Sequence, residues 1–184
     1  MPATQLALLR GINVGGKNKL AMRDLAGVFE HAGCQNVRTF IQSGNIIFTA
    51  SSTVTGGLSG VVASKITERF GYRIPVILRT ARQLRDVISN NPFIKAGIAE
   101  DTLHVMFLAD RPHPAKTAAL DPDRSAPDRF SVSGRDIYLH LPNGAGRSKL
   151  TNAWFDSALS TVSTGRNWRT VTKLLSMMEE KPEE

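Results

Sequence analysis

Apolar and polar positions in the first 80 residues change repeatedly between the two-residue period of strands and the 3.6-residue period of helices. Ser43 and Gly44 separate two apolar runs, which indicates a hairpin, and Gly71 ends a helical stretch. That stretch follows residues 52–55, which can supply an N-cap. Its apolar residues are expected to lie on one side of the helix, namely Leu58, Val61, Val62, Ile66 and Phe70. In chain order the pattern predicts a strand at 5–10, a helix at 21–32, strands at 37–42 and 45–50, the helix that ends at Gly71, and a strand at 74–80.

The second half of the chain repeats this order of elements. A tight turn at Gly134 and Arg135 again joins two short apolar runs. The predicted elements are a strand at 102–109, a helix at 114–120, strands at 129–133 and 136–141, a helix at 148–159 in which Ser148 can act as the cap, and a strand at 161–165. Residues 81–90 are expected to be helical, 90–97 to be a connection, and 168–179 to form a closing helix.

Two copies of β-α-β-β-α-β predict an α+β protein made of two ferredoxin-like α-β plait units from an internal duplication, plus a C-terminal helix. The first and third strands of each unit are expected to be central and parallel. The predicted domains are residues 1–80, a basic N-terminal unit; 81–100, a helical connection; and 101–184, the C-terminal unit with the closing helix.

Charge is distributed unevenly along the chain. The net charge is +7, but residues 1–85 hold 11 Lys/Arg and 3 Asp/Glu, which is +8, and the remaining residues sum to −1. This asymmetry favours an anionic partner for the first half, either a small molecule or a nucleic acid, although solubility alone would also account for it. A lone cysteine, Cys34, and the lack of a membrane span or signal peptide favour a cytoplasmic protein with no membrane partner.

The stretch "LLRGINVGGKNK" combines glycines with three cations, Arg10, Lys17 and Lys19. It nearly matches a phosphate-binding P-loop, but Asn18 stands where a Ser or Thr would coordinate Mg²⁺. A hairpin after the first helix also conflicts with the parallel sheet of P-loop enzymes, so a nucleotide-hydrolysing P-loop is disfavoured. Two interpretations stay open: successive backbone amides that form an anion nest before a helix, or a glycine-rich connection with solvated lysines.

Two later stretches have a related composition. "LPNGAGRSKLTNAW" brings Arg147 and Lys149 into a loop that precedes a helix. "TGRNWRTVTKLL" offers Asn167 as an N-cap, and Trp168 as a core anchor rather than a platform for a base. A capped helix start accounts for both stretches without any ligand.

Together with "FIQSGNIIF", these stretches resemble the bacterial domain-of-unknown-function family numbered 1697. The resemblance covers nearly the whole chain and implies two ferredoxin-like plaits. It brings no established activity. The family's motif positions are matched by Arg10, Gly11, Asn13, Gly15, Gly16, Lys17, Ser43, Gly44, Asn45, Gly146, Arg147, Ser148, Lys149, Arg166, Asn167, Trp168, Thr170 and Lys173.

The histidines and the single cysteine indicate no metal site, because none of them is paired at ligand spacing. His104 and His140 fall on predicted strands and are expected to share a sheet face with Tyr138. That arrangement would suit either the stacking of RNA bases or packing between the two sheets. Packing between sheets agrees better with the sequence, because the RNA-binding signature is missing. No cofactor is indicated, and neither an activated nucleophile nor an oligomeric state can be inferred.

The leading hypothesis is a protein that binds a phosphate-bearing ligand, a nucleotide or nucleic acid, through its glycine-rich basic loops. The expected ligand-binding residues are Arg10, Asn13, Gly15, Gly16, Lys17, Ser43, Asn45, Arg147, Ser148, Lys149, Arg166, Asn167 and Lys173. One alternative is an enzyme, a transferase or hydrolase, that acts on a phosphorylated substrate with Lys17 or Lys149 stabilising charge. Another is a structural or interaction module whose motif residues share no pocket.

Overall fold

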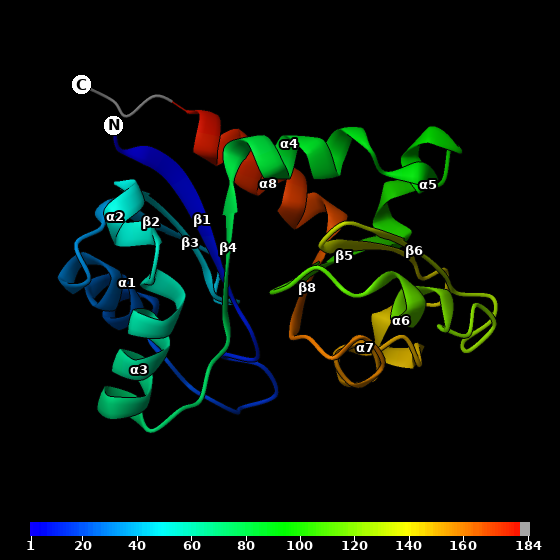
Figure 1. Ribbon diagram of the computed structural model, residues 1–184, viewed down its shortest axis with the longest axis horizontal. Helices are drawn as coiled ribbons and strands as arrows, with labels where there is room; N and C mark the ends of the chain where they lie inside the picture. The colour runs from blue at the N-terminus through cyan, green and yellow to red at the C-terminus, as the bar shows by residue number, and fades with distance from the viewer. Residues whose placement is uncertain (181–184) are drawn as a thin grey trace. The chain divides into compact units, whose positions relative to one another are not determined.

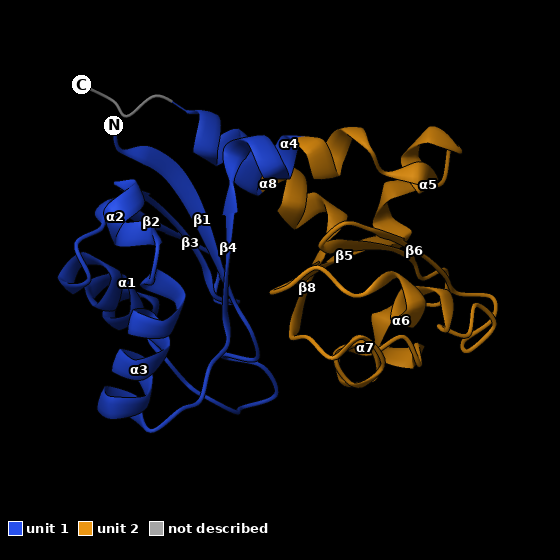
Figure 2. Ribbon diagram, viewed as in Figure 1, with its two compact units in different colours: residues 1–85, 174–184 blue, residues 86–173 orange. Residues whose placement is uncertain are grey.

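The computed structural model describes residues 1–180 and divides the chain into two compact units. Unit 1 consists of residues 1–85 with the segment that starts at Leu174, and unit 2 consists of residues 86–173 (Figure 2). The division falls within two helices, α4 (Ala81–Ser89) and α8 (Trp168–Glu179). Within unit 1, an ion pair of 2.6 Å between Arg85 Nε and Glu179 Oε1 joins the unit 1 parts of these two helices.

Unit 1 is a four-stranded antiparallel sheet with helices over one face (Figure 1). Its elements are β1 (Ala3–Leu9), α1 (Met22–His31), β2 (Gln35–Phe40), β3 (Asn45–Ala50), α2 (Ser52–Thr55), α3 (Leu58–Phe70) and β4 (Val76–Thr80). The strand order is β2-β3-β1-β4. Apolar residues of α1 and α3, including Phe29 and Ile66, pack on Leu9 and Phe48 of the sheet to form the core.

Unit 2 has the same kind of sheet, with strand order β6-β7-β5-β8. Its elements are α5 (Pro92–Lys95), η1 (Glu100–Thr102), β5 (Leu103–Leu108), α6 (Pro114–Ala118), β6 (Arg129–Ser133), β7 (Asp136–His140), η2 (Ala145–Arg147), α7 (Asn152–Leu159) and β8 (Ser163–Asn167). Phe155 and Leu159 of α7 pack against Met106 and Leu139 on one face of this sheet. The mixed α+β class predicted from the sequence is confirmed.

The first and third strands of each unit are central, as predicted, but they are not parallel. β1 pairs with β3 antiparallel, and β5 pairs with β7 in the same way. The reason is topological: the crossover through a helix returns the second strand in the direction of the first, and the hairpin then reverses the third. Antiparallel pairing also removes the parallel sheet on which a P-loop depends.

Several local predictions need correction. Residues 52–55 form the short helix α2, which is capped by Ser51, and α3 starts afterwards at Leu58. Val61 is 45% exposed, so it does not share the buried side of α3. Gly71 ends α3 as predicted, in the left-handed conformation. The helix expected at 148–159 starts at Asn152, and the last strand runs from Ser163 to Asn167.

The two strand histidines of unit 2 lie on opposite faces of their sheet. The register pairs His104 with Leu139 and His140 with Leu103. Because neighbouring residues on a strand point to opposite faces, His104 faces away from His140 and Tyr138. The predicted shared face of these three residues is therefore wrong. Tyr138 instead donates its hydroxyl to the backbone carbonyl of Val87 at 3.0 Å, within unit 2.

Candidate functional site

The loop between β1 and α1, residues 10–20, is here called the basic loop. Five of its residues have positive φ, namely Gly11, Asn13, Gly15, Gly16 and Asn18. The loop folds back on itself, and the backbone amide of Lys17 donates to the carbonyl of Val14 at 3.0 Å. Glycine and asparagine tolerate the left-handed conformation better than other residues do, which explains this composition without reference to a ligand.

Asn13 holds the basic loop closed with its side-chain amide. Its Nδ2 donates to the carbonyl of Leu20 at 2.8 Å and to that of Gln42 at 3.1 Å. Its Oδ1 accepts the backbone N–H of Leu20 at 2.9 Å. Asn18 adds a bond of 2.9 Å from its own amide to the carbonyl of Gly11. Both asparagines therefore act as braces that shape the loop.

The hairpin turn at Ser43–Asn45 packs against the end of β1. Asn45 is fully buried, and its Nδ2 donates to Ser43 Oγ at 2.9 Å and to the carbonyl of Phe40 at 3.1 Å. Gly44 has φ +76°, and a Cβ placed there would lie 2.8 Å from the Cβ of Leu9. Glycine is thus required for close packing at this point. This turn brings Gln42 next to Asn13.

A cavity of about 400 Å³ opens where the basic loop meets the start of α1. It is lined by Asn13, Gly16, Lys19, Leu20, Ala21 and Gln42. The N-cap of α1 is Ala21, so no side chain caps the backbone N–H groups of the first turn. The acidic residue in that turn, Asp24, lies 3.7 Å from Arg69. An open helix end beside Lys19 is an environment that favours negative charge.

Two contributors to this cavity, Gln42 and the uncapped start of α1, were not predicted from the sequence. The alanine at position 21, where a Ser, Thr, Asp or Asn would normally cap the helix, was a readable signal. Gln42 offered no comparable signal, because its role depends on the contact between the hairpin turn and Asn13.

The glycine-rich loop of unit 2 differs from the basic loop at the helix that follows. Thr151 caps α7, accepting the N–H of Trp154 at 3.2 Å, so the predicted cap Ser148 is wrong. Ser148 Oγ instead accepts the N–H of Leu150 at 3.0 Å. Arg147 and Lys149 are exposed. At the start of α7, a side chain therefore already accepts one of the first-turn backbone N–H groups. At the start of α1, no side chain does so.

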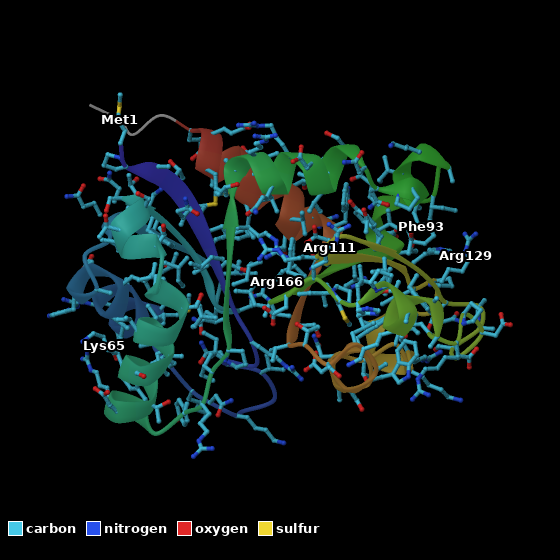
Figure 3. The ribbon with its side chains drawn as sticks, in the orientation of Figure 1. Met1, Lys65, Phe93, Arg111, Arg129 and Arg166 are labelled. Atoms are coloured by element: carbon cyan, nitrogen blue, oxygen red, sulfur yellow. The ribbon has the colours of Figure 1, made fainter. Side chains whose placement is uncertain are left out.

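The remaining predicted residues lie on β8 and α8. Arg166 is only 8% exposed, and its Nη1 donates to Thr164 Oγ1 at 2.9 Å and to the Gly165 carbonyl at 2.8 Å (Figure 3). Burial lowers the pKa of Arg166 to about 10. Asn167 Oδ1 accepts the N–H of Thr170 at 2.8 Å, so the predicted cap of α8 is confirmed. Trp168 is buried, as expected of a core anchor, and Lys173 is exposed.

The predicted ligand-binding residues divide between the units. Unit 1 contains Arg10, Asn13, Gly15, Gly16, Lys17, Ser43 and Asn45, and unit 2 contains Arg147, Ser148, Lys149, Arg166, Asn167 and Lys173. Within unit 1, one hydrogen bond of 3.1 Å joins Asn13 of the basic loop to the carbonyl of Gln42, just before the hairpin turn.

Two broader properties concern residues 1–180 only. No helix in this range is long and apolar enough to cross a membrane. In the same range, no three His, Cys, Asp or Glu side chains are grouped so as to hold a metal ion.

The comparisons with known proteins support the fold and the family. No curated protein matches the chain. A solved structure, described as a conserved bacterial protein from Streptococcus pneumoniae, is 19% identical, with a TM-score of 0.74 over 98% of this chain and 100% of its own. At that identity the likeness concerns the fold alone. The family DUF1697, described as a protein of unknown function, matches residues 3–138, which is more than half of the chain. The chain therefore belongs to the DUF1697 family.

Proposed function

We propose that unit 1 binds a phosphate-bearing ligand, a nucleotide or nucleic acid, in the cavity between the basic loop and α1. The observation that carries this proposal is the start of α1, which no side chain caps and whose N-cap residue Ala21 lines the cavity together with Lys19 and Gly16. Backbone N–H groups at a helix start point outward and carry a partial positive charge. A phosphate oxygen is a suitable acceptor for such groups.

The charge of the surrounding chain supports the same ligand. Arg10, Lys17 and Lys19 all belong to the basic loop, and the first 85 residues carry a net charge of +8. Asp24 opposes an anion at the same helix end, but its ion pair with Arg69 offsets part of that charge. Lysines act on phosphate as point charges, while an arginine can donate two parallel hydrogen bonds.

The proposed residues have two kinds of role. Gly15, Gly16, Lys17 and Arg10 would contact the ligand through backbone amides or charge, whereas Asn13, Ser43 and Asn45 would position the loop. In unit 2 the proposal assigns an anion-binding role to the exposed cations Arg147, Lys149 and Lys173, with Ser148, Arg166 and Asn167 in support. The support for these residues of unit 2 is weaker, because Thr151 already caps α7, the helix that follows Arg147 and Lys149.

We also infer that each unit is a ferredoxin-like plait derived from one duplicated ancestor, in domains close to those predicted. The two sheets have equivalent strand orders. A buried arginine occupies the fourth position of the last strand in each unit, Arg79 in β4 and Arg166 in β8. Both guanidinium groups donate to the backbone carbonyl of the preceding residue.

Isothermal titration with inorganic phosphate and adenosine monophosphate tests the proposed function. We expect binding at about 50 mM salt that weakens modestly at about 200 mM, since a small ligand releases few counterions. Lys19→Gln should weaken it about three- to tenfold, the range for one partly exposed charge-assisted contact. Lys65→Gln on α3 removes the same charge from unit 1 outside this cavity and should have no such effect (Figure 3). Absence of binding at low salt would refute the proposal.

A further inference from the structure

Two large aliphatic side chains that are next in sequence to lining residues of the proposed site are exposed to water. Val14 is 61% exposed and Ile41 is 51% exposed. They are the chain neighbours of Asn13 and Gln42, which line the cavity and are hydrogen bonded to one another at 3.1 Å. The hydrogen bond therefore keeps the backbone at positions 14 and 41 close to the residues that line this cavity.

Ile41 also has an unfavourable backbone conformation. Its φ is +49°, and a β-branched residue in the left-handed region is uncommon. Turns with this conformation are normally occupied by glycine, asparagine or aspartate, which would also suit an exposed position.

We propose that Val14 and Ile41 contact the base of a nucleotide, free or within a single strand, whose phosphate lies in the cavity at the start of α1. This inference rests on the proposed function and specifies its ligand. Inorganic phosphate or a sugar phosphate would use the cations and amides of the basic loop and leave the aliphatic side chains idle. A nucleotide uses both, because every base has an apolar face beside a charged phosphate.

An anionic lipid surface would also combine apolar and charged contacts, but it fits the site less well. Membrane-surface anchors rely mainly on Trp, Phe and Leu. Here the apolar residues are one valine and one isoleucine, and their chain neighbours Asn13 and Gln42 line a cavity of about 400 Å³. A cavity of that volume suits a small molecule rather than a lipid surface.

Titrations of the full chain with uridine monophosphate, adenosine monophosphate, ribose 5-phosphate and inorganic phosphate test the inference. We expect both nucleotides to bind about tenfold more tightly than ribose 5-phosphate, which lacks the base. The double variant Val14→Ser, Ile41→Asn should reduce nucleotide affinity to that of ribose 5-phosphate and leave ribose 5-phosphate binding unchanged. Asparagine accepts the backbone conformation at position 41, so the turn is retained. Val61→Ser, which removes another exposed valine, is the matched control and should bind as the wild type does.

The outcomes separate this inference from the proposed function. Equal binding of ribose 5-phosphate and the nucleotides would overturn the inference while the proposed function stands. No binding of any of these ligands would overturn both. Two other results would also overturn the inference if the nucleotides bind no more tightly than ribose 5-phosphate. One is binding to phosphatidylglycerol vesicles that the double variant abolishes, and the other is self-association that the double variant abolishes. A short oligouridylate distinguishes the two sources of nucleotide, because binding to a strand should have the steeper salt dependence.

Discussion

The side-chain amide of Asn13 and the backbone carbonyl of Gln42 are joined at 3.1 Å across 29 residues of sequence. This bond ties the loop after the first strand to the turn of the hairpin that follows the first helix. The same Asn13 Nδ2 also donates to Leu20, immediately before α1. One side chain thus positions three segments around the proposed ligand site, so the site depends on asparagine as much as on its charged residues.

Replacing Asn13 should therefore affect both stability and binding. Asn13→Ala removes the bonds to Leu20 and Gln42 and puts alanine at φ +53°, so we expect a loss of about 2–4 kcal/mol in the free energy of unfolding. Asn13→Gly removes the same bonds but tolerates the conformation, so its loss should be smaller. Urea unfolding measures both values. If the two variants matched the wild type in stability, Asn13 would not be a brace.

Replacing Gly44 should cost more stability than replacing Gly134, the glycine of the hairpin in unit 2. Gly44→Ala combines positive φ with a Cβ 2.8 Å from Leu9, so we expect it to cost about 3 kcal/mol. Gly134→Ala is a matched control in the hairpin of unit 2, where φ is +59° and no atom lies within 4 Å. It should cost about 1–2 kcal/mol from the backbone alone. Equal losses in urea unfolding would contradict the close packing of Gly44.

Asn167 should stabilise α8 through its cap. Asn167→Ala leaves the N–H of Thr170 without its acceptor at 2.8 Å, and we expect a loss of about 1 kcal/mol. Asn167→Asp keeps an acceptor at that position and should lose little. Thermal unfolding of the two variants tests this difference, and indistinguishable midpoints would contradict the capping role.

Unit 2 should lose stability as the pH falls because of His104. Burial lowers the pKa of His104 more than the backbone of Thr102 raises it. Below the ordinary histidine pKa of about 6.5, the unfolded chain therefore binds a proton that the folded chain resists. The resulting penalty is absent near pH 7.5 and grows as the pH falls through 6.5.

Urea unfolding at about pH 7.5 and 5.5 measures this effect in the wild type and in His104→Gln. The variant should lose less stability between the two pH values. It will still lose some, because the pKa of His140 is also lowered, first by burial and then by Arg129. Identical pH dependence in the two proteins would show that His104 does not contribute.

The fold was largely predictable because local patterns determine most of it. Gly71 and Asn167 ended and capped helices where their chemistry requires, and the repeated element order gave the α+β class. The predictions were wrong where strand direction and side-chain face depend on how distant segments of the chain pair. The direction of β3 relative to β1 follows from the crossover and hairpin together, and the opposed faces of His104 and His140 follow from their register.

The candidate site was only partly predictable. Glycines and cations of the basic loop are visible in the sequence, and the alanine before α1 was a signal that went unread. The contact of Gln42 with Asn13 joins residues far apart in sequence, and no local pattern encodes it. Asn45 was predicted as a ligand-binding residue, yet it is buried with its amide bonded to the hairpin turn, which suits a positioning role.

A phosphate site at the start of α1 can be tested by following backbone amide resonances by nuclear magnetic resonance while adenosine monophosphate is added. We expect the largest, saturable shifts at Gly16 and at the first-turn amides of Met22 and Arg23, because these N–H groups would donate to the phosphate. If these amides stay unchanged at saturating ligand while others shift, or if none shifts, the start of α1 is not a phosphate site.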